Sequence, residues 1–199
     1  MDEQRAIERL KQGDLAGLEY LVHRHQIEAL RVADLITRDR AVAEDVVQNA
    51  FLRAAERIEQ FESGRPFAPW FLRIVRNDAI KAARRRERTL SLHSLTGDGE
   101  TALAQLLADR GITPEQAAEA GDLRDAVWQA MGRLPPEQRD AMVQRYYLDW
   151  SEAEMAAEAG APRGTIKWRL HRAREQSRYF LRSFGSGYPR LVEKEREAE

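Results

Sequence analysis

Residues 151–174 have the sequence SEAEMAAEAGAPRGTIKWRLHRAR, which predicts two helices joined by a tight turn. Ser151 and Glu154 have the three-residue spacing of a capping box, so a helix is expected to begin there. Gly160 favours the end of that helix, and Pro162 suits the first turn of the next one. A short helix, a tight turn and a longer basic helix together predict a helix-turn-helix.

The second of these helices has an apolar side and a cationic side. At about 100° per residue, one stripe faces the domain, and Trp168 lies roughly opposite to it. The apolar stripe consists of Ile166, Leu170, Ala173 and Ser177. Arginine and lysine contact phosphates and guanine edges, and an exposed indole offers an apolar surface to a thymine methyl group, a sugar or a protein partner. A solvated charged face is the simpler alternative, but the capped helix and turn before it favour a helix that enters a DNA groove.

The 199-residue chain contains no cysteine, which excludes disulfides, thiolate metal sites and cysteine nucleophiles. Its start, MDEQRAIERL, has neither the basic region nor the apolar run of a signal peptide. No apolar run approaches membrane-spanning length. We therefore expect a cytoplasmic protein without membrane insertion.

The formal net charge of −1 conceals two basic blocks. Residues 61–90 include eight basic and three acidic residues, and residues 161–182 include seven basic and one acidic residue. Residues 91–122, between the blocks, include six acidic residues and one basic residue. Each basic block can therefore neutralise phosphates although the whole protein is not basic.

Helical periodicity covers most of the remaining sequence, and no period-two strand pattern is present. Asp14 is expected to cap one helix, and a second amphipathic helix is expected over residues 41–58. A loop at 61–69 contains one glycine and two prolines, and a third helix follows from near Trp70 to Arg88. An acidic linker, with one short helical turn near 103–108, precedes the second group of helices.

The expected fold is all-α, with two small helical domains joined by a flexible linker and a helix-turn-helix in the second domain. The expected boundaries are 1–90 for the first domain, 91–121 for the acidic linker, 122–184 for the second domain and 185–199 for a C-terminal extension. That extension is either a disordered tail or a short added helix.

The first basic block combines a cationic helix with aromatic residues in the preceding loop. Helical angles place Asn77 on an exposed polar strip beside the cluster KAARRRER at 81–88. Phe61 and Phe67 lie in the loop, and single-stranded nucleic acid is bound by such combinations of positive charge and aromatic faces. Two alternatives stay open. One is that the aromatic residues Phe61, Phe67 and Trp70 belong to the core. The other is that the arginine cluster serves only to stabilise the C-terminal end of the helix through the helix dipole.

Four stretches carry a family resemblance: AEDVVQNAFLRA at 43–54, PWFLRIVRNDAI at 69–80, LPPEQRDA at 134–141 and GTIKWRLHRARE at 164–175. In this order the chain resembles bacterial RNA polymerase sigma factors of the sigma-70 family, specifically the short extracytoplasmic-function (ECF) type, from about residue 13 to residue 181. The resemblance implies a non-enzymatic transcription initiation factor that directs core RNA polymerase to promoters. It implies no cofactor and no metal site.

The resemblance also implies roles for individual residues. The clamp helices of the largest polymerase subunit are expected to be bound by Asp45, Gln48, Asn49, Phe51 and Leu52. The −10 element is expected to be opened and recognised by Phe61, Phe67, Arg73, Asn77, Lys81, Arg84, Arg85 and Arg86. The −35 duplex is expected to be recognised by Arg163, Thr165, Lys167, Trp168, Arg169, His171 and Arg172. The second domain is further expected to contact the flap of the other large subunit, and an anti-sigma factor is a possible partner of the chain.

Two positions depart from the family pattern. Lys81 stands where the family usually has aspartate, and Trp168 stands where it usually has a small polar residue. Both positions face DNA in the resemblance, so promoter sequence preference does not carry over from the family.

Two other classes of protein are alternatives to this interpretation. A helix-turn-helix regulator that binds an operator as a dimer explains the second domain but not the first basic block. An enzyme acting on nucleic acid would need a catalytic motif, and no HExxH, nucleophile elbow or glycine-rich phosphate loop is present. The carboxylates of Glu44 and Asp45 alone are weak support for a divalent-metal site.

Overall fold

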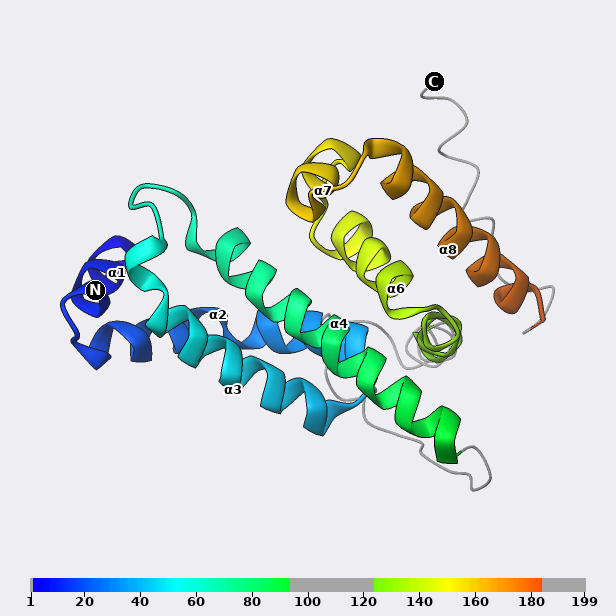
Figure 1. Cartoon of the computed structure of the whole chain (residues 1–199), viewed down its shortest axis with the longest axis horizontal. Helices are drawn as coiled ribbons and strands as arrows, with labels where there is room; N and C mark the ends of the chain where they lie inside the picture. Colours follow the sequence, from blue (N-terminus) through cyan, green and yellow to red (C-terminus); the bar gives the residue numbers. More distant parts are fainter. Residues whose placement is uncertain (1, 94–123, 184–199) are drawn as a thin grey trace, which may run out of the picture.

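The computed structural model describes residues 2–93 and 124–183, which form two groups of helices with no strand among them (Figure 1). The N-terminal domain contains α1 (Glu3–Lys11), α2 (Leu15–Thr37), α3 (Arg40–Glu56), the short 3₁₀ turn η1 (Ile58–Gln60) and α4 (Phe67–His93). The C-terminal domain contains a helix over residues 124–132, then α6 (Pro136–Met142), the π-helical turn η2 (Val143–Tyr147), α7 (Glu152–Ala159) and α8 (Arg163–Ser183). The predicted all-α fold is therefore confirmed. The predicted linker was to begin at residue 91, but residues 91–93 belong to α4; the rest of the linker and the C-terminal extension lie outside the described residues.

Aspartate side chains begin the first three helices. Asp2, Asp14 and Asp39 accept hydrogen bonds from the backbone N–H groups of Arg5, Ala16 and Val42, respectively. Each bond satisfies an amide that has no partner within its own helix. The predicted cap at Asp14 is confirmed, whereas α1 was not predicted.

The short helix α1 packs on the start of α2 and also supports the loop before α4. A Cβ atom at Gly17 would overlap the Ala6 carbonyl oxygen, so only glycine allows this close crossing of the two helices. Lys11 Nζ donates hydrogen bonds to the Phe61 carbonyl at 2.8 Å and to Ser63 Oγ at 3.0 Å. The N-terminal helix therefore holds the loop in place.

A cluster of stacked aromatic rings forms the centre of the N-terminal domain. The Phe71 ring stacks on Phe51 with 4.3 Å between centroids and on Phe67 with 5.5 Å. Phe61 and Trp70 pack beside Phe67 at 5.7 Å and 5.5 Å. The helix α4 begins at Phe67, earlier than expected, because Pro69 is tolerated in a first turn where the amides lack helical partners.

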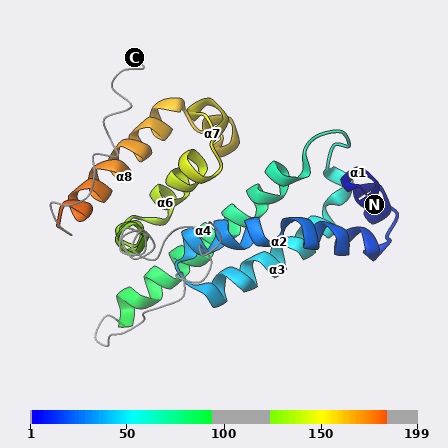
Figure 2. The same cartoon turned by 180° about the vertical axis from the view of Figure 1, so that it is seen from behind.

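The helix-turn-helix is present as predicted. Ser151 and Glu154 form a reciprocal capping box, and α7 ends at Gly160, whose φ of 57° is left-handed. On α8, the side chains of Ile166, Leu170 and Ala173 are buried against the rest of the C-terminal domain. The helix α8 packs on α6 and α7 and lies on the outer side of the C-terminal domain, away from α2 and α3 (Figures 1 and 2).

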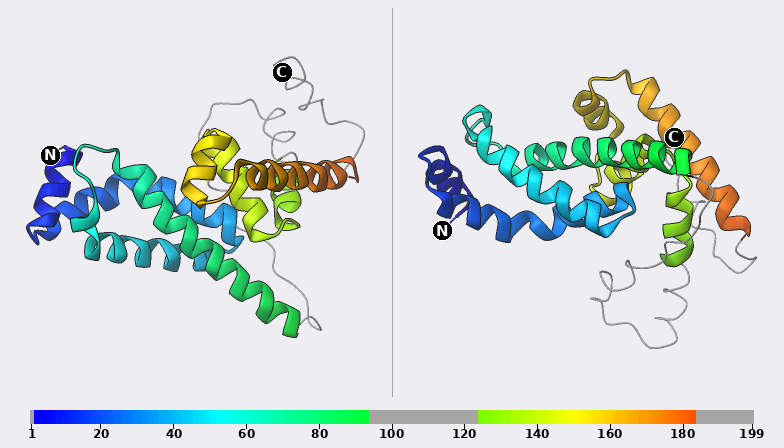
Figure 3. Two further views of the ribbon diagram at one scale, coloured as in Figure 1. Left: turned by 45° about the horizontal axis from the view of Figure 1, so that its top comes forward. Right: turned by 60° about the horizontal axis from the view of Figure 1, so that its bottom comes forward.

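The two domains are docked along α2 and α4. The larger apolar core continues from the N-terminal domain into the C-terminal domain through Met131, Leu134 and Val143. Figure 3 shows the C-terminal helices gathered at one end of the α2–α4 bundle, with α1 at the opposite end. The contact runs mainly between α6 and the pair α2 and α4.

Candidate nucleic-acid interface

The exposed side of α4 borders a groove of about 310 Å³ that combines positive charge with one aromatic ring. Its lining comprises Arg53, Arg57, Gln60, Trp70, Arg73, Ile74, Asn77, Asp78 and Lys81. Asn77 is exposed, as the helical angles predicted, and its amide offers both a donor and an acceptor at the groove. The groove therefore offers charge, an aromatic surface and an amide within one hollow, the combination that unstacked bases require.

Ion pairs join α3 and α4 within this groove. Arg53 Nη1 lies 2.6 Å from both carboxylate oxygens of Asp78, and Lys81 Nζ lies 3.6 Å from the same carboxylate. Asp78 is largely covered, whereas Lys81 remains mostly exposed. Lys81 therefore presents its ammonium group at the surface, and the charge here is opposite to the aspartate that the resemblance leads one to expect.

The structure supports the core alternative for Phe61 and Phe67. Only 3% of Phe61 and 1% of Phe67 is exposed, because both rings fill the aromatic cluster under α4. Neither ring presents a face on which a base could stack in this arrangement. Trp70, which is half-buried at the groove, is the aromatic residue that remains accessible.

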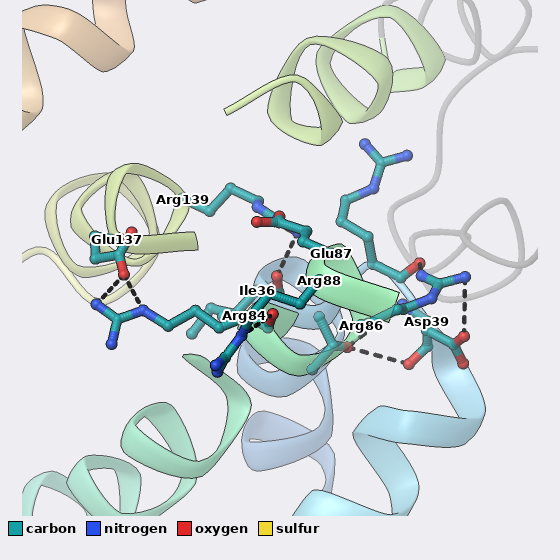
Figure 4. Close-up of polar contacts among 10 residues, drawn as sticks. Ile36, Asp39, Arg84, Arg86, Glu87, Arg88, Glu137 and Arg139 are labelled. Atoms are coloured by element: carbon teal, nitrogen blue, oxygen red, sulfur yellow. Dashed lines mark hydrogen bonds and ion pairs between the residues drawn. The ribbon is translucent and has the colours of Figure 1, made fainter. Parts of the chain in front are cut away.

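The arginine cluster near the end of α4 is exposed but largely engaged in ion pairs (Figure 4). Arg84 pairs with Glu137 of the C-terminal domain, and Arg86 Nη2 lies 3.2 Å from Asp39. Arg85 is one of the residues that line a second groove, of about 560 Å³, between α3 and α4. This second groove is also lined by Asp45 and Asn49, so it joins the cationic cluster to the outer side of α3.

The outer side of α3 carries four of the five side chains expected to bind polymerase. Asp45, Gln48, Asn49 and Leu52 are exposed, and 58% of Leu52 is accessible although the residue is apolar. Phe51 is the exception: it is 6% exposed and stacks on Phe71. The expectation that Phe51 forms part of this surface therefore needs correction, because its ring belongs to the core.

The outer side of α8 presents the side chains expected at the −35 element. Trp168 is 59% exposed and lies on the opposite side from the buried Ile166. Arg163, Lys167, His171 and Arg172 are exposed, and Thr165 and Arg169 are half-buried. The carboxylate of Glu175 lies close to two of these side chains: its Oε2 is 3.1 Å from Arg172 Nη1, and its Oε1 is 3.6 Å from His171 Nε2. All seven predicted residues therefore lie on α8, and each of them is exposed or half-buried.

Sequence reasoning missed a buried ion pair between the domains. Arg76 Nε donates to Asp140 Oδ1 at 2.7 Å, and Arg76 Nη2 donates to Oδ2 at 3.0 Å. Gln144 Nε2 also donates to Asp140 at 2.7 Å, and the Arg76 guanidinium lies over the Trp150 ring. Arg76 falls within the basic block at 61–90, but no local pattern in the sequence indicated a partner 64 residues away.

Two further arginines cross between the domains. Arg139 is buried, donates to the Ile36 carbonyl at 2.6 Å and pairs with Glu87, as Figure 4 shows. Arg38 donates to the Trp128 carbonyl and stacks on the Trp128 ring at 3.9 Å. Burial lowers the pKa of the Arg38 guanidinium to about 10, with nearby Arg139 acting in the same direction, and the group stays protonated at neutral pH.

In the described parts of the chain, no three histidine, aspartate or glutamate side chains are grouped as metal ligands would be. Among the same residues, no helix is long and apolar enough to cross a membrane.

Each of the two domains matches the model of a known protein family. Residues 21–89 match the model of sigma-70 region 2, and residues 124–176 match that of sigma-70 region 4. The chain is 30% identical over 178 residues to the ECF RNA polymerase sigma factor SigW of Bacillus subtilis, covering 88% of this chain and 95% of SigW. It is 32% identical over 177 residues to the ECF sigma factor SigL of Mycobacterium tuberculosis, covering 86% and 93%.

Two solved structures share the fold. One is the sigma factor RpoE of Bartonella quintana, solved in complex with the anti-sigma factor NepR, with a TM-score of 0.62 at 24% identity over 82% of this chain and 96% of that one. The other is CnrH, solved with the cytosolic domain of CnrY, with a TM-score of 0.58 at 22% identity over 91% and 97%.

Proposed function

The chain belongs to the sigma-70 family of RNA polymerase sigma factors, in its ECF group, and from that membership we propose how its surfaces divide between polymerase and promoter DNA. As a promoter-directing transcription initiation factor, it must contact both the enzyme and two separate DNA elements. One observation carries the proposal. Each of the two matched regions contains a helix that packs its apolar side into the core and presents basic side chains on its other side.

The groove beside α4 is the proposed site for the melted −10 element. Asn77 supplies base-edge hydrogen bonds, Trp70 supplies an accessible ring, and Arg73 and Lys81 supply charge for the backbone. Arg84, Arg85 and Arg86 extend the positive surface toward the end of α4. Phe61 and Phe67 support this site from below by fixing the start of α4.

The outer side of α8 is the proposed site for the −35 duplex. Helix-turn-helix proteins place their second helix in the major groove, where its N-terminal residues contact base edges. Arg163 and Lys167 lie in the first turns of α8, and Arg172 lies further along for a phosphate. Trp168 supplies the apolar contact between them.

The outer side of α3 is the proposed polymerase-binding surface, with Leu52 as its apolar anchor. An isolated, well-exposed leucine surrounded by Asp45, Gln48 and Asn49 has the composition of an interface with a polar rim. We assign no catalytic chemistry to the chain, and its place of action is the cytoplasm, where core polymerase is found. An anti-sigma factor is also proposed as a partner, because the fold relative RpoE was solved with one.

The direct test is run-off transcription with bacterial core polymerase, with and without this protein, on a library of genomic fragments. Specific transcripts that need the protein, with shared sequences near −35 and −10, are the expected result. Arg172→Ala should weaken binding to −35 duplex DNA while core polymerase is still retained in a pull-down. Initiation no better than core alone would contradict the proposal, and tight binding of the isolated protein to a palindromic duplex would favour the dimeric regulator instead.

A further inference from the structure

Trp168 differs from the other three tryptophans of the chain in having no partner for its ring. Trp70 packs in the aromatic cluster, and Trp128 and Trp150 each lie beneath an arginine. The indole of Trp168 is 59% exposed, and within the described residues no hydrogen bond, ring contact or cation–π pair engages it. Tryptophan is enriched where proteins contact other molecules, so this ring is suited to a partner outside the chain.

Gly164 leaves open space one helical turn before this indole. It is exposed in the first turn of α8, and a Cβ atom added there would meet no heavy atom within 4 Å. Alanine would therefore fit the fold, and alanine favours a helix more than glycine does. Side chains on a helix lean toward its N-terminus, so the Trp168 ring covers the surface above Gly164. The fold does not require this glycine, whereas close approach by a ligand does.

Positive charge borders the indole on both sides. Lys167 and Arg172 flank the line of α8 that Trp168 occupies, and their side chains are 67% and 58% exposed. Each has one carboxylate partner on the surface, Glu152 at 4.0 Å and Glu175 at 3.1 Å, and such pairs are weak enough for phosphates to replace. A cationic border of this kind favours duplex DNA over an apolar protein groove.

The position of the ring on α8 selects one feature of that duplex. Trp168 lies opposite the buried Ile166, so it projects away from the domain, toward the base edges, while the flanking cations reach the phosphates at the groove walls. Sugars lie along those walls. Among the base edges in the major groove, the apolar group is the C5 methyl of thymine.

We propose that Trp168, lying over the open backbone at Gly164, is a specificity-determining residue that selects thymine in the −35 duplex by contacting its C5 methyl group. The inference rests on the proposed function of α8. Removing one carbon from water corresponds to about a fourfold change in affinity, so a contacted thymine is preferred by about that factor over the same base without its methyl. The missing side chain at Gly164 allows α8 to approach closely enough for this contact.

The test uses the full-length chain bound to core RNA polymerase. Promoters that this holoenzyme transcribes are first selected from a random library. Each thymine in the selected −35 region is then replaced singly by uracil, which removes only the methyl group and keeps the base pairing. Competition against fluorescent promoter DNA gives the ratio of the affinities for thymine and uracil at each position.

This ratio is measured for the wild type and for Trp168→Ala, Trp168→Phe and Gly164→Ala. Tyr179→Ala is the matched control, because it removes an exposed ring from the same helix about 16 Å further along. Urea denaturation and a pull-down of core polymerase accompany each variant, so that changes in folding or polymerase binding are seen directly.

The wild type is expected to bind at least one thymine about fourfold more tightly than uracil. In Trp168→Ala that preference should disappear, and Trp168→Phe should keep part of it because an aromatic ring remains. Gly164→Ala should also lower the preference, while its unfolding midpoint stays at or above that of the wild type. Tyr179→Ala should keep the wild-type preference even if its total affinity changes.

The inference is overturned if the selected −35 region contains no thymine, if uracil binds as well as thymine everywhere, or if the preference persists in Trp168→Ala. Loss of core polymerase from Trp168→Ala would place the indole in a protein interface and overturn it too. An unchanged preference in Gly164→Ala overturns the role of the glycine. None of these results contradicts the proposed function while the holoenzyme gives specific transcripts, and the absence of such transcripts contradicts that function itself.

Discussion

Trp168 and Ile166 lie two residues apart on α8 and face opposite ways: 59% of the indole is exposed, whereas 1% of the isoleucine is. The isoleucine joins Leu170, Met155 and Ala156 in the small core of the helix-turn-helix. The indole contributes little to that core. Trp168 is therefore expected to matter for DNA recognition, and Ile166 for the stability of the domain.

Trp168→Ala should weaken binding to −35 duplex DNA by about 1–2 kcal/mol, because an apolar contact with a base or sugar is lost. The unfolding midpoint in urea should stay within experimental error of the wild type. The matched change Ile166→Ala should instead destabilise the protein by about 2–5 kcal/mol through a core cavity. Duplex binding by fluorescence anisotropy, measured beside urea denaturation, checks both. A large loss of stability in Trp168→Ala would contradict its assignment to the surface.

Leu52→Ala should reduce retention of core RNA polymerase in a pull-down by about tenfold, because it removes the apolar anchor from the outer side of α3. Its thermal stability should not change. Phe51→Ala, one residue away, should cost about 3–5 kcal/mol of folding stability through loss of its stacking on Phe71. Should Leu52→Ala bind polymerase as well as the wild type does, the proposed surface is wrongly placed.

Asn77→Ala should weaken binding of the holoenzyme to a forked −10 DNA by about 1–3 kcal/mol, because a base-edge hydrogen bond is lost. Retention of core polymerase should be unaffected, since Asn77 lies on α4 and the proposed polymerase surface on α3. Lys81→Asp, which introduces the aspartate usual in the family, should change which −10 sequences are selected from a random library. Unchanged selection by Lys81→Asp would show that this position does not contact bases.

Asp34 gives a pH-dependent prediction about stability. Burial raises the pKa of its carboxyl above the ordinary value, while the charges of Arg40 and Arg38 act in the opposite direction. The folded state therefore holds this proton more tightly than the unfolded state does, so stability is lost as pH rises through the folded pKa. Asp34→Asn should be more stable than the wild type at pH 7, and the difference should shrink as pH falls toward 4.

Asp14 is the matched control for that experiment. Hydrogen bonds from the Ala16 amide and then from Arg9 lower the pKa of its carboxyl. Its contribution to stability is therefore present above the ordinary pKa of aspartate and is lost as pH falls. Asp14→Asn should thus show the opposite trend with pH in the same urea titrations. Parallel trends for the two variants would contradict the assigned causes.

Local sequence patterns predicted what depends on local geometry. The capping box at Ser151, the turn at Gly160 and the outward position of Trp168 follow from spacing along one helix, and the structure has all three. Motif resemblance was less reliable for single side chains. It assigned Phe51 to the polymerase surface because the residue falls inside the motif, but helix rotation turns its ring into the core.

The contacts between the domains could not be predicted in this way. Arg76 and Asp140 are 64 residues apart, and the charge of each is typical of a solvated helix. Pairing across such a separation depends on how two folded units pack, which no short window of sequence contains. The basic side of α4 was therefore recognised from sequence, but its partner was not.

The bonds from Lys11 to the Phe61 carbonyl and to Ser63 Oγ link the first helix of the chain to the loop that leads into α4. A truncation that removes α1 would remove both hydrogen bonds, although α1 lies far in sequence from any proposed DNA contact. Promoter opening measured on such a shortened protein would then report a loop that has lost these two contacts with Lys11.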